Sequence, residues 1–204
     1  IAACDLSITA NDVSITWNLN FTYLAVSVQV NRATEEACVF SLGFSKGGAA
    51  SYAARRAADG SKQLRYQLYQ DSGLTKVLKD EADISSIDEV VQGGFQAGAT
   101  PVSQTLNYYL EIPYNLATTP ALVASGNYAD TFTIYVYEGA GPPFAPAVAT
   151  KSINLSVTVM PMIALSLIDP GAVFQLGQLS RNATFSTLNE GATASMDLRV
   201  RTNA

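Results

Sequence analysis

Residues 124–137 read Ala-Ser-Gly-Asn-Tyr-Ala-Asp-Thr-Phe-Thr-Ile-Tyr-Val-Tyr, a turn followed by a long run of β-forming residues. Successive side chains of a strand face opposite sides of its sheet, so alternating apolar and polar residues indicate a half-buried strand. Phe132, Ile134 and Val136 occupy one face of such a strand. The stretch therefore predicts a strand from Tyr128 to Tyr137, preceded by a turn at Gly126.

The same alternation recurs along the chain. From Val13 to Tyr23 the odd positions are apolar and the even positions are polar, and the phase changes at Leu24-Ala25. A turn or a bulge must intervene there, because a shift of one residue exchanges the two faces of a strand. Many short strands separated by Gly, Pro, Ser and Asp predict an all-β sandwich. The other alternating runs cover residues 38–44, 64–69, 106–112, 152–159 and 194–200.

Composition excludes several functional classes. The chain has 204 residues, a net charge of −5 and no histidine. Phosphate binding needs clustered Lys and Arg, and histidine is the commonest general base and metal ligand. No apolar run reaches the roughly 18 residues of a membrane helix. We therefore expect no nucleic-acid partner, no membrane span, no cofactor and no enzymatic activity.

Two cysteines, Cys4 and Cys38, are the only ones in the chain. In an oxidising compartment they would form one disulfide, and the Ser-, Thr-, Gly- and Ala-rich composition is typical of a secreted β protein. The alternative is two buried free thiols. The spacing is far from the Cys-x-x-Cys pattern of a redox site.

Two charged motifs are candidate binding sites. The acidic residues Asp80, Glu81, Asp83, Asp88 and Glu89 do not match the spacing of an EF-hand loop, so we expect a solvated acidic loop. The adjacent Arg55-Arg56 pair could bind an anion.

Three motifs follow the cysteines in a recognisable order. They are Arg55-Arg56, Leu64-Arg-Tyr-Gln-Leu-Tyr69 and Gly126-Asn-Tyr-Ala-Asp-Thr131. In this order the chain resembles the spore coat protein U domain over residues 1 to about 160. The resemblance implies an immunoglobulin-like, pilin-type β-sandwich from an archaic chaperone–usher pilus, in which the arginine has a structural role. One departure is the missing Trp-Gly after Tyr69, where the chain reads Thr75-Lys-Val-Leu-Lys79.

The resemblance also implies a place in the pilus. Pilins of this class lack a final strand and receive it from the N-terminal extension of a neighbour. Only Ile1-Ala2-Ala3 precede Cys4, and Ser152–Val159 resembles a final strand supplied by the chain itself. We therefore expect an adhesin domain over residues 1–160 and a linker with the truncated start of a second pilin domain over 161–204. An extension preceding residue 1 would instead favour a non-adhesive shaft or coat subunit.

Three segments are apolar where loops are usually polar: residues 138–149, residues 93–102 and the phase change at 23–26. The resemblance implies a tip adhesin whose loops attach to hydrophobic surfaces, as in biofilm formation, or to a host receptor. Alternatively, Phe95 and Phe144 lie in the core, or a glycan binds beside Tyr108, Tyr109 and Tyr114. The expected contact residues are Val102, Pro142, Pro143, Phe144, Ala145 and Val148.

The partners implied by the resemblance are a periplasmic chaperone, an outer-membrane usher and the adjacent pilin, all acting by strand donation. The protein would then be secreted through the periplasm to the pilus tip at the cell surface.

Overall fold

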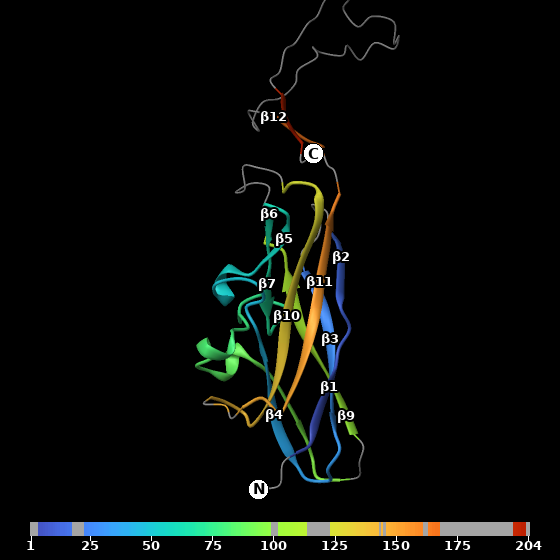
Figure 1. Ribbon diagram of the computed structural model, residues 1–204, viewed down its shortest axis with the longest axis vertical. Helices are drawn as coiled ribbons and strands as arrows, with labels where there is room; N and C mark the ends of the chain where they lie inside the picture. Colours follow the sequence, from blue (N-terminus) through green and yellow to red (C-terminus); the bar gives the residue numbers. More distant parts are fainter. Residues whose placement is uncertain are drawn as a thin grey trace, which may run out of the picture.

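The computed structural model is an all-β protein with three single-turn 3₁₀ helices (Figure 1). It describes residues 4–17, 23–98, 102–113, 123–142, 144 and 146–160, and the backbone of 163–167 and 198–202. The 3₁₀ helices are η1 (Tyr52–Ala54), η2 (Glu81–Asp83) and η3 (Ile87–Glu89). The strands are β1 (Leu6–Thr9), β2 (Val13–Trp17), β3 (Tyr23–Arg32), β4 (Cys38–Phe44), β5 (Arg56–Asp59), β6 (Lys62–Arg65), β7 (Gln67–Tyr69), β8 (Val91–Phe95), β9 (Val102–Glu111), β10 (Gly126–Glu138), β11 (Ala149–Val159), β12 (Ile163–Leu167) and β13 (Leu198–Thr202).

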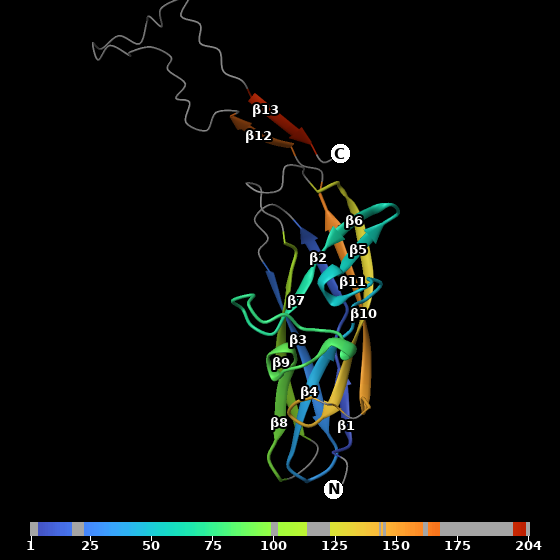
Figure 2. The same ribbon diagram turned by 90° about the vertical axis from the view of Figure 1, so that its left-hand side faces the viewer.

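Two sheets pack face to face, as the views in Figures 1 and 2 show. One sheet has the strand order β1-β3-β9-β7, and the other has the order β2-β11-β10-β4-β8 with the β5–β6 hairpin joined to β10. Strands that are neighbours in sequence repeatedly enter different sheets, which is the connectivity of an immunoglobulin-like sandwich. The predicted fold class is therefore confirmed. A separate two-stranded sheet pairs β12 with β13.

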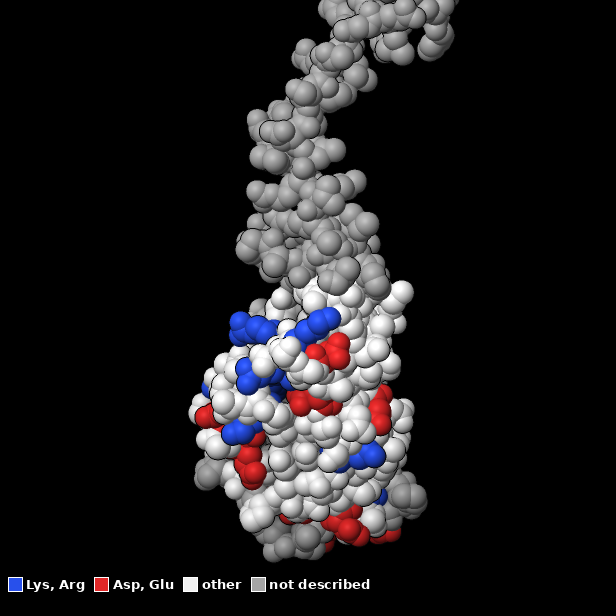
Figure 3. Space-filling model, turned by 45° about the horizontal axis from the view of Figure 1, so that its top comes forward, with Lys and Arg blue, Asp and Glu red and all other residues white. Residues whose placement is uncertain are grey.

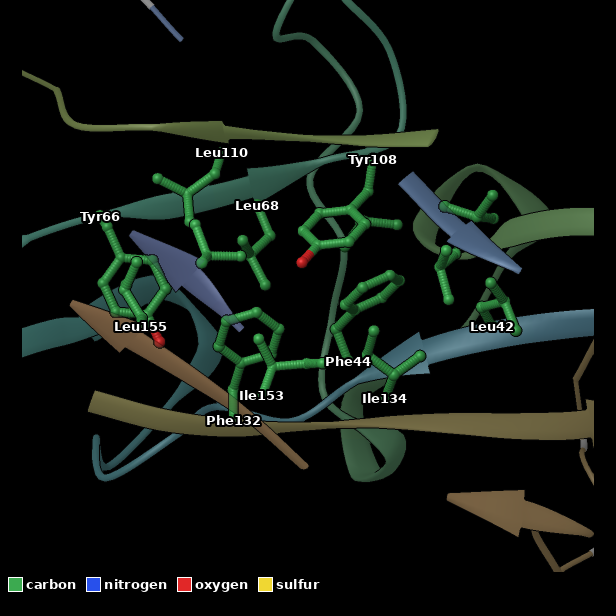
Figure 4. Close-up of a cluster of buried hydrophobic side chains, with 14 of the residues drawn as sticks. Leu42, Phe44, Tyr66, Leu68, Tyr108, Leu110, Phe132, Ile134, Ile153 and Leu155 are labelled. Atoms are coloured by element: carbon green, nitrogen blue, oxygen red, sulfur yellow. The ribbon is translucent and has the colours of Figure 1, made fainter. Parts of the chain in front are cut away.

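The core lies between the two sheets and is built from the inward-facing residue of each pleat (Figure 4). Tyr108 of β9 packs against Phe44 of β4, with ring centroids 4.9 Å apart, and against Phe132 of β10 at 6.3 Å. These aromatic contacts join strands of opposite sheets, so they fix the distance between the layers.

The strand expected over Val13–Tyr23 is divided between the two sheets. β2 ends at Trp17 and pairs with β11, whereas β3 begins at Tyr23 and pairs with β1 and β9. The change of alternating phase therefore marks a change of sheet, and residues 18–22 lie outside the described residues. The loop expected at Tyr23–Val26 was wrong, because these residues open β3.

Two further boundaries differ from the sequence expectation. The run Leu64–Tyr69 contains the end of β6 and the whole of β7, which belong to different sheets, and Tyr66 lies between them. The apolar segment 93–102 is in part not a loop, since its first three residues complete β8 and Val102 opens β9. Paired strands satisfy the backbone groups of these residues, which a loop would leave to water.

Strand β11 occupies the position between β10 and β2, antiparallel to the first and parallel to the second. Its inward residues Ile153, Leu155, Val157 and Val159 are all buried. The strand expected at Ser152–Val159 is thus present and central in its sheet. The division into domains at residue 160 stays a prediction.

Candidate functional site

The turn between β3 and β4, the residues that follow β8 and the connection between β10 and β11 lie together at one end of the sandwich (Figure 1, bottom). We call residues 33–37, 96–98, 139–142, 144 and 146–148 the loop end. β11 finishes at the opposite end, near the start of β3 and of β10. Loops clustered on a rigid sandwich are the usual place for a binding surface.

The structure places the predicted contact residues in different surroundings. Val148 is exposed, Pro142 and Phe144 are half-buried, and Val102 is half-buried against the core at the start of β9. Pro143 and Ala145 lie outside the described residues. The six residues are therefore not equivalent, and the binding role of each stays a prediction.

Phe144 anchors the β10–β11 connection to the outer face of the sheet. Its ring stacks on Tyr137 with centroids 4.7 Å apart and an interplanar angle of 16°. Tyr137 itself is fully buried, and burial raises its pKa, with Glu81 as a second cause. Because its ring packs on Tyr137, Phe144 holds the β10–β11 connection against the sheet. Phe95 is buried against Phe40, with ring centroids 5.5 Å apart, as the alternative interpretation expected.

Hydrogen bonds fix both ends of the same connection, and at the β11 end the Val148 amide donates to the carbonyl of Val136 at 2.8 Å. The Gly139 amide donates to the carbonyl of Val39 at 2.8 Å, and the Ser41 hydroxyl donates to the carbonyl of Gly139 at 2.8 Å. The Gln92 side chain donates to the carbonyl of Ala140. A connection held in this way loses little conformational entropy when it contacts a surface.

Exposed apolar side chains gather around this connection. Val148 lies within the connection and is 45% exposed. Val39, whose carbonyl accepts the hydrogen bond from Gly139, is 51% exposed. Ile87 is 50% exposed, and its methyl group lies 3.2 Å from where a Cβ on Gly141 would stand. Sequence reasoning missed Val39 and Ile87, because neither lies in a proline-rich loop. Among described residues, the five exposed large apolar side chains are Tyr23, Val39, Ile87, Val148 and Met160.

Arg32 lies buried beneath the other two loops of the loop end. Its guanidinium donates to the carbonyls of Glu36, Gln96 (2.7 Å) and Gly98 (3.1 Å), and it stands 5.4 Å from the centre of the Phe95 ring. The Gly98 amide in turn donates to the carbonyl of Glu35 at 2.9 Å. One side chain therefore ties the β3–β4 turn to the residues after β8.

Cys4 and Cys38 lie side by side at the same end and are both buried thiols in this structure. Burial, followed by the hydrogen bond with Cys4, raises the pKa of Cys38 to about 12. The thiols are adjacent although 34 positions separate them in sequence, as a disulfide would require. The disulfide itself stays a prediction.

The two adjacent arginines have different environments. Arg55 is buried, and its guanidinium donates to the carbonyls of Ser45 (3.0 Å), Phe44 (2.9 Å) and Leu78 (2.7 Å). Burial lowers its pKa to about 10. Arg55 therefore joins β4 to the segment after β7, a structural role, whereas Arg56 is exposed on β5.

The acidic residues of 80–89 stabilise a local turn. Glu89 closes a capping box with Ser86 and forms an ion pair with Lys79 at 2.6 Å, and Asp88 pairs with Lys76 at 2.8 Å. Burial would raise the pKa of Glu89, but the hydrogen bonds from Lys79, Ser85 and Ser86 lower it to about 2. In the part of the chain that is described, no group of three or more Cys, Asp or Glu could hold a metal ion.

The tyrosines of the glycan alternative do not share a cleft. Tyr108 is buried in the core, Tyr109 packs edge-on against Tyr23 at 5.6 Å, and Tyr114 lies outside the described residues. A polar hollow of about 590 Å³ lies elsewhere, over the outer face of β10. It is lined by Ser45, Lys46, Gly47, Asp80, Glu81, Ala82, Thr131, Thr133 and Tyr135.

The helices among the described residues are single turns, and none is long and apolar enough to cross a membrane. The fold and the loop end together define an immunoglobulin-like sandwich of the pilin type. The sequence profile of the Spore Coat Protein U domain matches residues 1–135, which is more than half of the chain. The chain belongs to the spore coat protein U domain family.

Solved structures with a similar fold include several pilus proteins. The CooA pilin subunit of enterotoxigenic Escherichia coli is 10% identical with a TM-score of 0.42, over 76% of this chain and 99% of that one. AggA, the major subunit of Escherichia coli aggregative adherence fimbriae type I, is 15% identical with a TM-score of 0.39, over 78% and 97%. The CsuC–CsuE chaperone–tip adhesion subunit complex of Acinetobacter baumannii Csu pili is 10% identical with a TM-score of 0.33, over 79% of this chain and 63% of that one. No curated protein matches the chain by sequence.

Proposed function

We propose that the protein is the tip adhesin of an archaic chaperone–usher pilus and that its loop end attaches bacteria to hydrophobic surfaces. Membership of the spore coat protein U domain family and the pilin-type fold support the pilus assignment. The central position of β11 supports a first sandwich that uses its own final strand. Such a sandwich is free to bind a surface instead of accepting a donor strand there.

The observation that carries the proposal is the gathering of exposed apolar side chains around the β10–β11 connection. Val39, Val148 and Ile87 are each about half exposed, and Phe144 holds the connection between them. Apolar area removed from water contributes about 25 cal/mol per Å², so a few such side chains give a weak contact. Many pili acting together multiply weak contacts into firm attachment.

The assembly partners that this role requires are a periplasmic chaperone, an outer-membrane usher and an adjacent pilin. Each would bind by strand addition, in which backbone hydrogen bonds extend a sheet and alternate side chains fill pockets. We assign this contact to the residues beyond 160, because β11 already fills the place between β10 and β2 in the first sandwich. The protein would pass through the periplasm to the pilus tip at the cell surface.

The test compares adsorption of two variants on hydrophobic and hydrophilic beads. The double variant Val39→Asp/Val148→Asp places charges beside the connection while leaving the Phe144–Tyr137 stack in place. Full burial of a valine side chain contributes at least about 1.5 kcal/mol. Each valine would bury about half of its side chain against the bead, so loss of both should weaken adsorption on the hydrophobic beads about tenfold.

Met160→Asp is the control, because Met160 is equally exposed and directly follows Val159, where β11 pairs with the start of β10 at the opposite end of the sandwich. Thermal melts confirm that the variants remain folded. Equal loss in the control and the double variant would refute a specific role for the loop end. Adsorption that is unchanged in the double variant but blocked by soluble sugars would instead favour the glycan-binding alternative.

A further inference from the structure

The β5–β6 hairpin places two arginines directly opposite each other. Arg56 of β5 is the register partner of Arg65 of β6, and both side chains are exposed on the same face of the hairpin. Like charges at directly opposite positions destabilise a pair of strands. Lys62 begins β6 but lies three register positions from Arg65, so its side chain faces the other side of the hairpin, where its ammonium donates to the carbonyl of Ser125 at 2.9 Å.

Arg56 and Arg65 form no ion pair within the described residues. The ion pairs found there join Lys46 to Asp80, Lys76 to Asp88 and Lys79 to Glu89, so the hairpin cations take part in none of them. Arg56 donates one hydrogen bond, to the Gln63 side chain at 3.1 Å, and Arg65 donates one, to the carbonyl of Ala53 at 3.2 Å. A guanidinium carries five N–H donors, so most remain available to a ligand.

Two carboxylates, one on the hairpin and one on the strand that pairs with it, are engaged elsewhere. Asp130 of β10 accepts hydrogen bonds from the Tyr66 hydroxyl at 2.7 Å and from the Gly48 amide at 3.1 Å. Asp59 lies opposite Lys62 in the register but its carboxylate is turned against Gly126 of β10. Two exposed guanidinium groups therefore face each other with no acid between them.

We propose that Arg56 and Arg65 form a binding surface for an acidic polysaccharide, which carries carboxylate or sulfate groups along its length. Guanidinium groups bind such oxyanions through paired N–H donors, more specifically than an ammonium group does. The hairpin projects from the sandwich (Figure 2), so it offers a ridge and not an enclosed cavity. A linear polymer can lie across a ridge and place successive anions on separate cations, whereas a single small ion would stay exposed to water.

The surrounding charge is compatible with this ligand despite the net charge of −5. Charges more than about 8–10 Å apart are largely screened at physiological ionic strength, so the distant acidic residues repel the bound polymer only weakly. Figure 3 shows Lys and Arg side chains gathered near the end of the sandwich opposite the loop end. The surface is therefore separate from the proposed adhesive contact. Either proposal can be refuted by its own experiment without refuting the other.

The experiment measures binding to immobilised heparin, which carries sulfates and carboxylates, and to polygalacturonate, which carries only carboxylates. The double variant Arg56→Gln/Arg65→Gln should bind about tenfold more weakly, since an exposed ion pair contributes a factor of up to about five. Wild-type binding should weaken when the salt concentration rises from about 0.1 M to 0.5 M. Binding to both polymers identifies the carboxylate as a sufficient group, and binding to heparin alone identifies the sulfate.

The matched control is Lys46→Gln/Lys76→Gln, which removes the same charge from cations that are already ion-paired. It should retain wild-type binding. A third variant, Arg65→Glu, places an opposite charge across from Arg56, so its melting temperature should stay equal or rise while polymer binding is lost. The proposal is overturned if the wild type binds neither polymer, or if the control loses as much binding as the Arg56→Gln/Arg65→Gln variant.

Discussion

Leu155 provides the sharpest test of the role of β11 in the first sandwich. The residue lies in the middle of the strand, opposite Asp130 of β10 and Val13 of β2. Its side chain is buried and points into the core close to Tyr66 (Figure 4). If β11 is an integral strand, Leu155→Ala removes packing from the centre of the molecule and leaves a cavity.

The expected cost follows from that position. A fully buried Leu→Ala substitution reduces the free energy of unfolding by about 3–5 kcal/mol, of which part is lost transfer energy and part is the cavity. For a domain of about 150 residues each kcal/mol lowers the melting temperature by about 2–4 °C. We therefore expect the melting temperature to fall by about 10 °C.

The assay is thermal and urea unfolding of the wild type, Leu155→Ala and the control Ser156→Ala. Ser156 is the next residue of the same strand but its side chain is exposed, so its substitution should change the free energy of unfolding by less than about 0.5 kcal/mol. Equal effects of the two substitutions would refute the reasoning. A loss of less than about 1 kcal/mol for Leu155→Ala would show that β11 is not firmly part of the core.

Three further outcomes are expected. Arg55→Met should reduce the free energy of unfolding by at least about 3 kcal/mol in urea, because it leaves the buried carbonyls of Phe44 and Leu78 without their donor. The lowered pKa of Glu89 stabilises the fold above pH 4.5, and this stabilisation is lost as the pH falls toward 2. The free energy of unfolding in urea should therefore depend less on pH in that range for Glu89→Gln than for the wild type. Burial and the contact with Cys4 raise the pKa of Cys38, so iodoacetamide should not modify Cys38 in the reduced native protein at about pH 8. Mass spectrometry of the exported protein should show a Cys4–Cys38 disulfide, which would stabilise the fold by about 3–4 kcal/mol.

Alternation predicted most of the strands, because each sheet has one buried face and its pattern has a period of two. The run 38–44 matches β4, and 128–137 lies within β10. The pattern did not show which sheet a strand joins, so a single predicted run crossed from β2 to β3 and another from β6 to β7. β8 was missed because its central Gly93-Gly94 pair has no side chains to alternate, and the Phe40 ring fills the space beside Gly93.

The candidate site was predictable in its location but not in its side chains. Proline and glycine marked the 139–148 connection, and the structure brings it to the loop end. A loop sequence cannot show which side chains point outward, so Phe144 was expected at the surface although its ring stacks on Tyr137. Val39 and Ile87 could have been found only from tertiary contacts, since they come from β4 and η3.

Burial distinguishes the roles of three arginines, Arg32, Arg55 and Arg56, which the sequence alone does not tell apart. Arg32 and Arg55 are enclosed, and each donates to three backbone carbonyls, so each holds segments together at a fixed distance. Removing either one would leave several buried acceptors unpaired, which costs more than the hydrogen bonds alone contribute. Arg56 differs because it faces Arg65 across a hairpin in water. Its charge lies opposite a like charge and is exposed to solvent, so the proposed anion-binding surface includes Arg56 and not the buried Arg55.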